Sequence, residues 1–358
     1  MEVGRPGEPS YAGGGTFSKI PLVLDPADLV GVDVAIVGAP VDEAVSHRPG
    51  ARFGPRAIRL ADPNATRPPR AWNMDLGLDP FEVLRVVDHG DAPVVPADRE
   101  RNHAAIRATV ADVVRAGAIP IVLGGDHSIA HPDVGAVADV RRPDRVGLIH
   151  FDAHADDADE IYGVKHSHGT PLRRLVEEGS LRGSDIVQVG LRGYWPGPEE
   201  FAWARAQGFR WYRMDEIQDR GIDDVVDAVL ADVADLPHVF LSVDIDVCDP
   251  AAAPGTGVPE PGGLDQRDLL RAVRRIAATV PLAGMEVVEV APPFDHAEVT
   301  ALLAHRVGLE ALSAAAPERE AGQGLEADPG REQGRPGGGV VGRRHRDDRP
   351  PGERDGGG

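Results

Sequence analysis

Aspartates and histidines gather in three short motifs of this 358-residue chain. Residues 124–128 read GGDHS, residues 152–156 read DAHAD and residues 244–246 read DID. In extended chain, residues two apart point the same way, so the second and third motifs can each direct their side chains into one site. The candidate metal ligands are four carboxylates and two imidazoles, namely Asp152, Asp156, Asp244, Asp246, His127 and His154.

This set of side chains predicts a pair of divalent metal ions. Four carboxylates in one pocket repel one another and take up protons unless cations compensate them. Two dications supply that compensation, and oxygen-rich ligation with imidazole but no thiolate favours Mn²⁺ over structural Zn²⁺. Two such ions can lower the pKa of a shared water towards neutrality, which would make it a nucleophile.

Each motif taken alone is also typical of a turn or a helix cap. The two glycines of GGDHS are expected to allow close backbone approach. We interpret Asp126 as a residue that fixes a neighbouring group rather than a metal ligand. His150 alternates away from the face of the DAHAD ligands and is not expected to bind metal. Cys248, beside the DID motif, is interpreted as a packing residue.

Apolar, β-branched runs precede these motifs, as expected for strands covered on both faces. Apolar residues at helical spacing predict helices over 98–116, 266–279 and 299–314. The alternation predicts one α/β domain with a mainly parallel sheet of about eight strands. In such a sheet ligands bind at the carboxyl ends of the strands, where the three motifs and Glu289 fall. The predicted strands lie within 32–41, 83–91, 118–126, 145–153, 185–193, 209–214, 238–246 and 283–292.

Composition divides the chain into three segments. Residues 1–20 are predicted to form an irregular arm, and residues 21–316 a single catalytic domain. Residues 317–358 have almost no apolar side chains and cannot offset the entropy of ordering, so this tail is predicted to be disordered. We interpret it as a dispensable extension; a flexible interaction tail and a shifted reading frame are the alternatives.

The overall charge excludes some classes of partner. The chain has 38 Lys and Arg against 58 Asp and Glu, a formal net charge of −20. This acidity argues against binding to nucleic acid or to an anionic membrane surface. A single cysteine excludes a disulfide framework, and no apolar run is long enough for a transmembrane helix. The N-terminal residues lack the features of a secretory signal, so we expect a cytoplasmic protein.

Longer motifs around the candidate ligands resemble a known family. GGDHS, FDAHAD, SVDIDVCDP and APGTGVPEPGGL are similar to signatures of the ureohydrolases, which include arginase, agmatinase and guanidinobutyrase. The resemblance covers roughly residues 20–315 and is strongest to agmatinase. It implies a three-layer α/β/α fold, a binuclear manganese site, hydrolysis of a guanidine to urea and an amine, and a homo-oligomer that is a trimer or hexamer.

The resemblance also implies roles for particular residues. One metal ion would be held by His127, Asp152, Asp156 and Asp244, and the other by Asp152, His154, Asp244 and Asp246. His168, in SHGT, falls where the family has a proton-shuttling histidine, and His166 is the second choice for that role. Glu289 falls where the family has the carboxylate that grips the substrate guanidinium.

The loop after DAHAD bears on the choice of substrate. Residues 157–163 read DADEIYG, an acidic loop that would repel a substrate carboxylate and attract a second cation. We therefore expect agmatine as substrate and putrescine as product, a step of polyamine biosynthesis. The alternative interpretation is that these acids are simply solvated. Tyr194 and Trp195 are candidates to line the substrate tail, and Asn73 to lie near the pocket mouth or at a subunit contact.

Other functions remain open from the sequence. Arg192 is a candidate for binding a substrate carboxylate, and would favour a guanidino-acid hydrolase acting on 4-guanidinobutyrate or a similar compound. Arginase activity is disfavoured by the acidic loop. A non-catalytic partner subunit would be signalled by loss of a metal ligand, and none is lost. A phosphoesterase is disfavoured because no cluster of cationic residues flanks the motifs.

Overall fold

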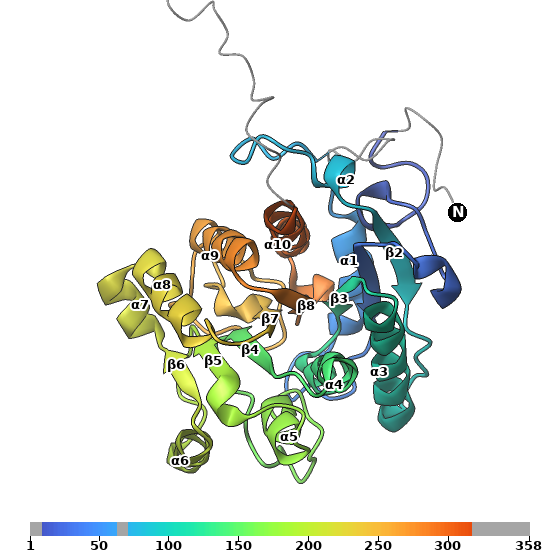
Figure 1. Ribbon diagram of the computed structural model, residues 1–358. Coiled ribbons are helices and arrows are strands. Elements are labelled where there is room, and N and C mark those ends of the chain that lie inside the picture. The colour runs from blue at the N-terminus through green and yellow to red at the C-terminus, as the bar shows by residue number, and fades with distance from the viewer. Residues whose placement is uncertain (1–8, 63–70, 317–358) are drawn as a thin grey trace, which may run out of the picture. The chain divides into compact units, whose positions relative to one another are not determined.

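The computed structural model describes residues 9–62 and 71–316. These residues form one eight-stranded sheet in the order β2-β1-β3-β8-β7-β4-β5-β6, and all neighbouring strands are parallel (Figure 1). The predicted parallel sheet is therefore confirmed, whereas the predicted tail, 317–358, lies outside the described residues. The strands are β1 Val34–Ala39, β2 Val86–Asp91, β3 Ile119–Gly124, β4 Val146–Phe151, β5 Ile186–Val189, β6 Arg210–Tyr212, β7 His238–Asp244 and β8 Leu282–Val288.

Helices cover both faces of the sheet and make the expected three layers (Figure 1). The short α2 (Pro80–Val83) precedes β2. The helices of one face are α1 (Gly54–Leu60), α7 (Met214–Arg220), α8 (Ile222–Asp232), α9 (Gln266–Thr279) and α10 (Val299–Ala315). The helices of the other face are α3 (Arg99–Arg115), α4 (Ala130–Arg141), α5 (Pro171–Glu177) and α6 (Pro198–Gln207). The three helices predicted from the sequence are confirmed as α3, α9 and α10.

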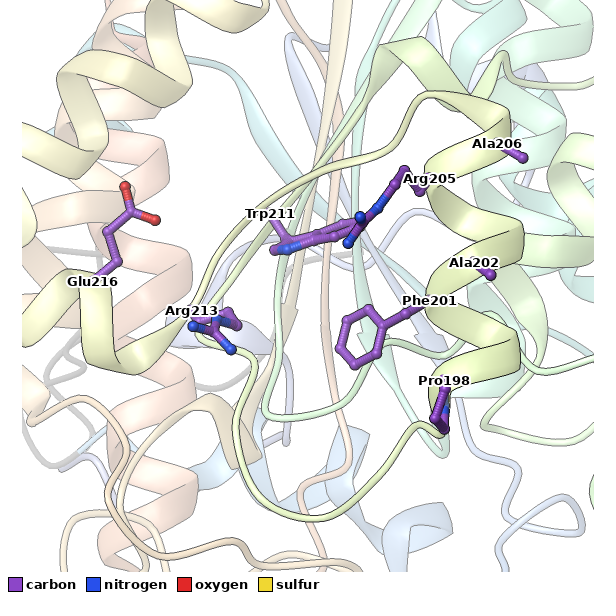
Figure 2. A pocket seen from close by; sticks show the side chains of 8 residues that line it. All are labelled: Pro198, Phe201, Ala202, Arg205, Ala206, Trp211, Arg213 and Glu216. Atoms are coloured by element: carbon purple, nitrogen blue, oxygen red, sulfur yellow. The ribbon is translucent and has the colours of Figure 1, made fainter.

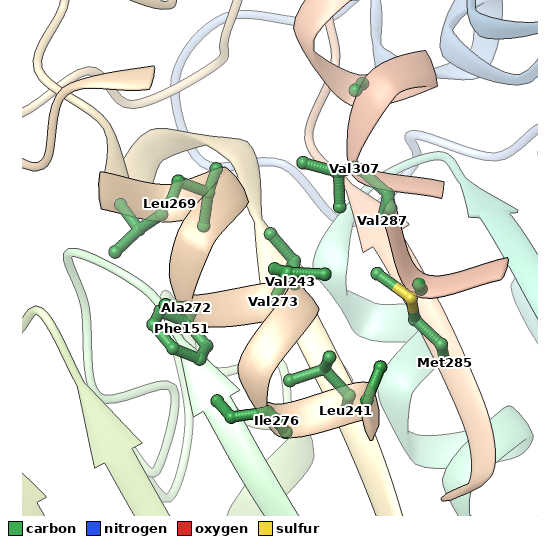
Figure 3. Close-up of a cluster of buried hydrophobic side chains, with 14 of the residues drawn as sticks. Phe151, Leu241, Val243, Leu269, Ala272, Val273, Ile276, Met285, Val287 and Val307 are labelled. Atoms are coloured by element: carbon green, nitrogen blue, oxygen red, sulfur yellow. The ribbon is translucent and has the colours of Figure 1, made fainter. Parts of the chain in front are cut away.

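Helix α9 shows how the sequence builds these layers. The side chain of Asp265 caps its N-terminus by accepting a hydrogen bond from the backbone N–H of Asp268 at 2.8 Å. Its apolar residues recur at helical spacing and turn one stripe towards the sheet. Figure 3 shows this stripe against side chains of β4, β7 and β8, and burial of each large aliphatic residue contributes about 1.5–3 kcal/mol. The buried residues of the stripe are Leu269, Ala272, Val273, Ile276 and Ala277.

The N-terminal end of the described chain packs against this domain. The short 3₁₀ turn Phe17–Lys19 buries the Phe17 ring, which stacks on His305 of α10 with ring centroids 4.1 Å apart. The backbone N–H of Phe17 also donates to Oδ2 of Asp88 at 2.9 Å. Part of the predicted arm is thus held against α10 and β2.

Four adjacent strands in the middle of the sheet, β3, β8, β7 and β4, bring the sequence motifs together. The register aligns Phe151 of β4 with Val243 of β7, and Asp244 with Val288 of β8. The residues that follow these strands therefore emerge side by side at one edge. Within the described residues, no helix has the length and apolarity needed to cross a membrane.

Candidate metal centre and active site

His127 and three carboxylates form the first cluster at this edge. His127 lies in the 3₁₀ turn that follows β3, and its side chain is fully buried. Its Nδ1 lies 3.0 Å from Oδ2 of Asp152, 3.0 Å from Oδ2 of Asp156 and 3.3 Å from Oδ2 of Asp244. One nitrogen and three carboxylate oxygens thus converge on a single point.

His154 and two carboxylates form a second cluster beside the first. Its Nδ1 lies 3.1 Å from Oδ2 of Asp246 and 3.4 Å from Oδ1 of Asp152. Asp152 therefore presents one oxygen to each cluster, which is the arrangement that a bridging carboxylate requires. The structure brings together the six ligands predicted from the sequence, at two adjoining points.

Local hydrogen bonds aim these side chains. The Oδ1 atom of Asp244 accepts from the backbone N–H of Asp246 at 2.8 Å and caps the turn after β7, which leaves Oδ2 to face His127. Asp126 caps the turn after β3 and also accepts from the backbone N–H of Ala44 at 3.0 Å, as its predicted fixing role requires. A Cβ atom at Gly125 would lie 2.0 Å from the carbonyl oxygen of Val41, so only glycine permits this close approach.

The cluster has the chemistry of a site for divalent cations. Nδ1 of His127 and Oδ2 of Asp152 are buried and have no hydrogen-bond partner among the described residues. Burial, together with the nearby charges of Asp246 and Asp152, raises the pKa of Asp244 well above its ordinary value. Burial also raises the pKa of Asp246 to about 6, because the neighbouring His154 only partly offsets burial and the charge of Asp152. Cations bound between these groups would remove the repulsion and satisfy the unpartnered atoms.

Three buried residues that support the cluster were not assigned a role from the sequence. Nε2 of His127 lies 2.9 Å from Oγ of Ser242 and 3.5 Å from Oε1 of Glu286, which together orient the ring. Nε2 of His150 lies 3.1 Å from Oδ2 of Asp152, and this nitrogen is close enough to the donor atoms of His127, Asp152 and Asp156 to join them, although the sequence did not lead us to expect it to bind metal. In the sequence, each of these residues is a polar side chain within an otherwise apolar strand, and this feature could have predicted their role.

Glu289 and His168 form a hydrogen-bonded pair beside the clusters. Oε1 of Glu289 accepts from the backbone N–H of His127 at 2.9 Å and lies 3.0 Å from Nδ1 of His168. Oε2 of Glu289 is buried without a partner, next to the space that Gly257 leaves open. Glu289 and Asp156 both have left-handed backbone angles, with φ of 61° and 49°, a strained conformation that gathers at functional sites.

Both ring nitrogens of His168 have a hydrogen-bond partner in the neutral form and in the charged form. In the neutral form, the backbone N–H of Ser46 donates to Nε2 at 3.0 Å and Nδ1 donates to Glu289. In the charged form, Nε2 donates to Oγ of Ser46, which lies 2.8 Å away. Burial lowers the pKa of His168, but the hydrogen bond and charge of Glu289 outweigh it and raise that pKa to about 9.

A cavity of about 490 Å³ opens onto this pair and onto the ligands. Tyr194 and Trp195 line it, as expected, and the Trp195 ring centroid lies 6.1 Å from that of His154. Cys248 is buried outside this lining, and burial raises the pKa of its thiol to about 12, in keeping with a packing role. None of the described residues that line the cavity is a lysine or an arginine.

The acidic loop contributes less to the cavity than its sequence indicated. Only Glu160 of its three acidic residues lines the cavity, where Glu260 joins it from another loop. Asp157 is fully buried, and burial together with Asp156 raises its pKa to about 8. Asp159 instead pairs with Arg174 of α5 at 2.9 Å. Apart from Glu289 and the candidate metal ligands Asp156, Asp244 and Asp246, the acidic residues that line the cavity are therefore Glu160 and Glu260.

Arg192 does not face the substrate cavity. Its Nε lies 3.1 Å from the carbonyl oxygens of both Glu260 and Pro261. Its terminal nitrogens donate to further backbone carbonyls, including that of Asp246 at 2.8 Å. The guanidinium therefore ties together the loops that follow β7, and the structure gives no support to Arg192 as a binder of a substrate carboxylate.

Two further residues considered from the sequence lie away from the cavity lining. The ring of His166 has its centroid 5.1 Å from that of His131 on α4, and His166 makes no contact with Glu289. The Nδ2 of Asn73 donates to Oε2 of Glu310 on α10 at 3.3 Å. Of His166 and His168, only His168 lines the cavity.

A second hollow, of about 840 Å³, lies between α6 and α7 beside the edge strand β6 (Figure 2). Phe201 and Trp211 point into it, and the guanidinium of Arg205 lies 5.8 Å from the centroid of the Trp211 ring. Its lining offers one carboxylate, Glu216, and no histidine. This hollow therefore lacks the donor set found at the central strands.

Comparison with known proteins agrees with the fold and the site. The family model described as the arginase family matches residues 32–313. The chain is 41% identical over 284 residues to the mitochondrial agmatinase of Gallus gallus, covering 79% of this chain and 81% of that protein. It is 39% identical over 304 residues to the guanidinobutyrase of Pseudomonas aeruginosa, covering 85% and 93%. The solved structure of proclavaminate amidinohydrolase from Streptomyces clavuligerus superposes with a TM-score of 0.80 at 36% identity, covering 86% of this chain and 99% of that one.

The chain belongs to the arginase family, the ureohydrolases. It is accordingly a hydrolase that acts on carbon–nitrogen bonds of amidines.

Proposed function

We propose that this protein is a binuclear-manganese amidinohydrolase that converts agmatine to urea and putrescine. The observation that carries the proposal is the free Oε2 atom of Glu289, buried in a cavity beside two adjoining His/Asp clusters. A planar cation is the natural partner for such an oxygen. The six ligands are those expected of a two-metal site, and the relatives named above act on guanidino compounds by their names.

The two clusters would each hold one divalent cation, and Asp152 would contact both. When bound, such cations supply an activated water and stabilise developing negative charge. Ser242, Glu286 and His150 hold the ligands in place for this purpose, because each contacts a ligand side chain.

Glu289 orients the substrate, and His168 supplies a proton to the leaving group. Oε2 of Glu289 accepts hydrogen bonds from the guanidinium and orients its plane, so that the central carbon faces the ligand cluster. Water adds to that carbon and the bond to the alkyl-bearing nitrogen breaks. His168, protonated near neutral pH, donates a proton to the departing amine nitrogen and regains one from the water that added, whose other proton also reaches the amine, so that the products are urea and the ammonium form of the amine.

The charge of the cavity supports agmatine over guanidino acids. Glu160 and Glu260 line it in addition to Glu289 and the candidate ligands, and they would attract the second cationic end of agmatine. A terminal carboxylate at the same place would be repelled, and the guanidinium of Arg192 is already bound to backbone carbonyls.

We also propose that the enzyme works in the cytoplasm as a homo-oligomer, a trimer or a hexamer. The support for the homo-oligomer is the resemblance to the ureohydrolases described above. Light scattering coupled to size-exclusion chromatography measures the assembly directly, and a monomeric mass for the active, metal-loaded enzyme would contradict it.

Urea release tests the substrate. Purified enzyme loaded with Mn²⁺ is assayed with agmatine, 4-guanidinobutyrate and arginine at equal concentrations. We expect urea chiefly from agmatine. Urea chiefly from 4-guanidinobutyrate would keep the chemistry and overturn the assignment of substrate, and absence of urea from all three would overturn both.

A pair of variants tests the metal centre. Asp244→Ala removes a ligand of the first cluster and is expected to abolish activity and to lower the manganese content measured by elemental analysis. Glu260→Gln alters a carboxylate at the mouth of the same cavity and should retain both metal ions. Full metal content and activity in Asp244→Ala would refute the site.

A further inference from the structure

A second group of histidines lies outside the cavity just described. His103 belongs to α3, His131 to α4, and His166 to the loop that leads into α5. One ring nitrogen from each lies within 4.8 Å of those of the other two. The ring centroids are 5.9 Å apart for His103 and His131, 5.9 Å for His103 and His166, and 5.1 Å for His131 and His166.

These rings have few partners of their own. His131 is 9% exposed; its Nδ1 has no hydrogen-bond partner among the described residues, and its Nε2 meets only the carboxylate of Glu178, in an ion-pair contact that is not a hydrogen bond. Nδ1 of His166 is likewise buried and unpartnered. Nε2 of His103 reaches only a weak contact, 3.3 Å from Oγ of Ser128. An unpartnered buried imidazole nitrogen costs free energy, and a ligand that accepts its lone pair would remove that cost.

Burial favours the metal-binding form of two of the three imidazoles, those of His103 and His166. Burial, assisted by repulsion from His131 and His166, lowers the pKa of His103 to about 3. Burial and His131 also lower the pKa of His166. Neutral imidazole is the state that ligates a transition metal, so no proton has to be displaced from these two rings near neutral pH.

The surrounding charges are mixed. Oε2 of Glu178, which follows α5, lies 2.9 Å from Nε2 of His131 and provides a negative group beside the cluster. The positive charges of Arg99 and Arg174 also reach His166. Arg174 is already paired with Asp159 and Glu177, at 2.9 and 3.0 Å, which reduces its opposition to a bound cation.

We propose that His103, His131 and His166 form a mononuclear site for an imidazole-preferring divalent cation of the Zn²⁺ class, separate from the binuclear centre. Three histidines with a carboxylate alongside are a usual donor set for zinc, whereas manganese prefers oxygen-rich sites. The bound ion joins α3 and α4 to the loop that carries His168. The proposal does not depend on the substrate of the enzyme.

Metal counting tests this site on the intact protein. Enzyme loaded with Mn²⁺ is given Zn²⁺, desalted, and analysed for both elements. We expect about one zinc ion per chain in addition to an unchanged amount of manganese. Zinc that binds only by displacing manganese, or no retained zinc, would overturn the proposal.

Variants locate the zinc within the chain. His131→Leu and His103→Leu are expected to weaken zinc binding at least about tenfold in competition with a chromogenic chelator. His238→Leu is the matched control, because His238 is a partly buried histidine on β7 whose Nε2 lies 3.4 Å from Oδ2 of Asp144. Equal zinc affinity in all three variants and the wild type would refute the site.

Two further readouts separate loss of zinc from loss of fold. Circular dichroism and manganese content must match the wild type before a variant is compared, and His103→Leu, at a less buried position, serves if His131→Leu fails to fold. Zinc should also raise the melting temperature of the wild type and of His238→Leu by a few degrees but leave the other two unchanged. An equal rise in His103→Leu would contradict the assignment.

Discussion

Oε1 of Glu289 is bound by the backbone of His127 and by His168, whereas its Oε2 has no hydrogen-bond partner among the described residues. Replacing Glu289 by glutamine keeps the shape but removes the charge that faces the substrate. We expect Glu289→Gln to lower kcat/KM for agmatine about 30- to 5,000-fold, with metal content unchanged. This factor corresponds to a loss of about 2–5 kcal/mol of transition-state stabilisation. Steady-state kinetics with elemental analysis measure both, and a loss of manganese in step with activity would instead make Glu289 part of the metal site.

His168 makes a prediction about pH. Its pKa is raised to about 9, so the proton it donates is present at lower pH and is lost as the pH rises through that value. We expect kcat to fall above about pH 9 in the wild type, and His168→Asn to have a lower kcat without this descending limb. The limb is measured between about pH 7 and pH 11 at constant metal content. Its persistence in the variant would assign it to another group.

The same raised pKa affects stability in the same direction. Because the folded protein binds this proton more tightly than the unfolded chain, His168 contributes stability below its ordinary pKa of 6.5, and this contribution is lost as the pH rises through about 9.

The predictability of the site differs from residue to residue. The DAHAD and DID spacings predicted that five of the six candidate ligands would share a site, because alternation in extended chain is a local property, and His127 was added from GGDHS. The support from Ser242 and Glu286 was not predicted, since it depends on which strands are neighbours. Arg192 was read as a possible substrate contact because its charge is visible in the sequence, but the backbone carbonyls that bind it are not.

Arg192 also makes a prediction at the level of the loops after β7. Its guanidinium supplies donors to several backbone carbonyls there, and Arg192→Met leaves them without these donors. We expect the free energy of unfolding to fall by about 2–4 kcal/mol, measured by urea denaturation. The control is Arg213→Met, which removes only an exposed ion pair with Asp215 and should change stability by less than about 1 kcal/mol.

Substrate kinetics of the same variant bear on specificity. If Arg192 only holds these loops, then Arg192→Met changes KM for agmatine and for 4-guanidinobutyrate by similar factors. A rise confined to 4-guanidinobutyrate would restore Arg192 as a carboxylate binder.

The elements themselves were easier to predict than their order. Most of the strands are short apolar runs with β-branched residues, β6 being an exception, and α9 has an unbroken apolar stripe, so local pattern identifies them. The order β3-β8-β7-β4 places the last two strands of the chain between the third and the fourth. No local pattern encodes this choice, because it depends on crossover connections between distant segments.

The charge of the whole molecule affects how substrate arrives. The chain has a formal net charge of −20, and two bound dications leave it strongly negative. Agmatine carries two positive charges, so its encounter rate should depend on ionic strength. We expect kcat/KM for agmatine to fall about two- to tenfold between low and high salt, as screening shortens the range of attraction.

The matched control for this effect is 4-guanidinobutyrate, which carries no net charge. Its kcat/KM should change little over the same range of salt. A parallel decline for both compounds would point to an effect of salt on the enzyme rather than on electrostatic steering.

The left-handed backbone of Asp156 and Glu289 has a consequence for protein engineering. Each position holds a side chain where glycine would be less strained, at a cost of about 1–3 kcal/mol. A selection for heat resistance that did not also demand turnover would favour glycine at these two positions and would discard the enzyme's chemistry. Thermal tolerance and catalysis therefore have to be selected together in this protein.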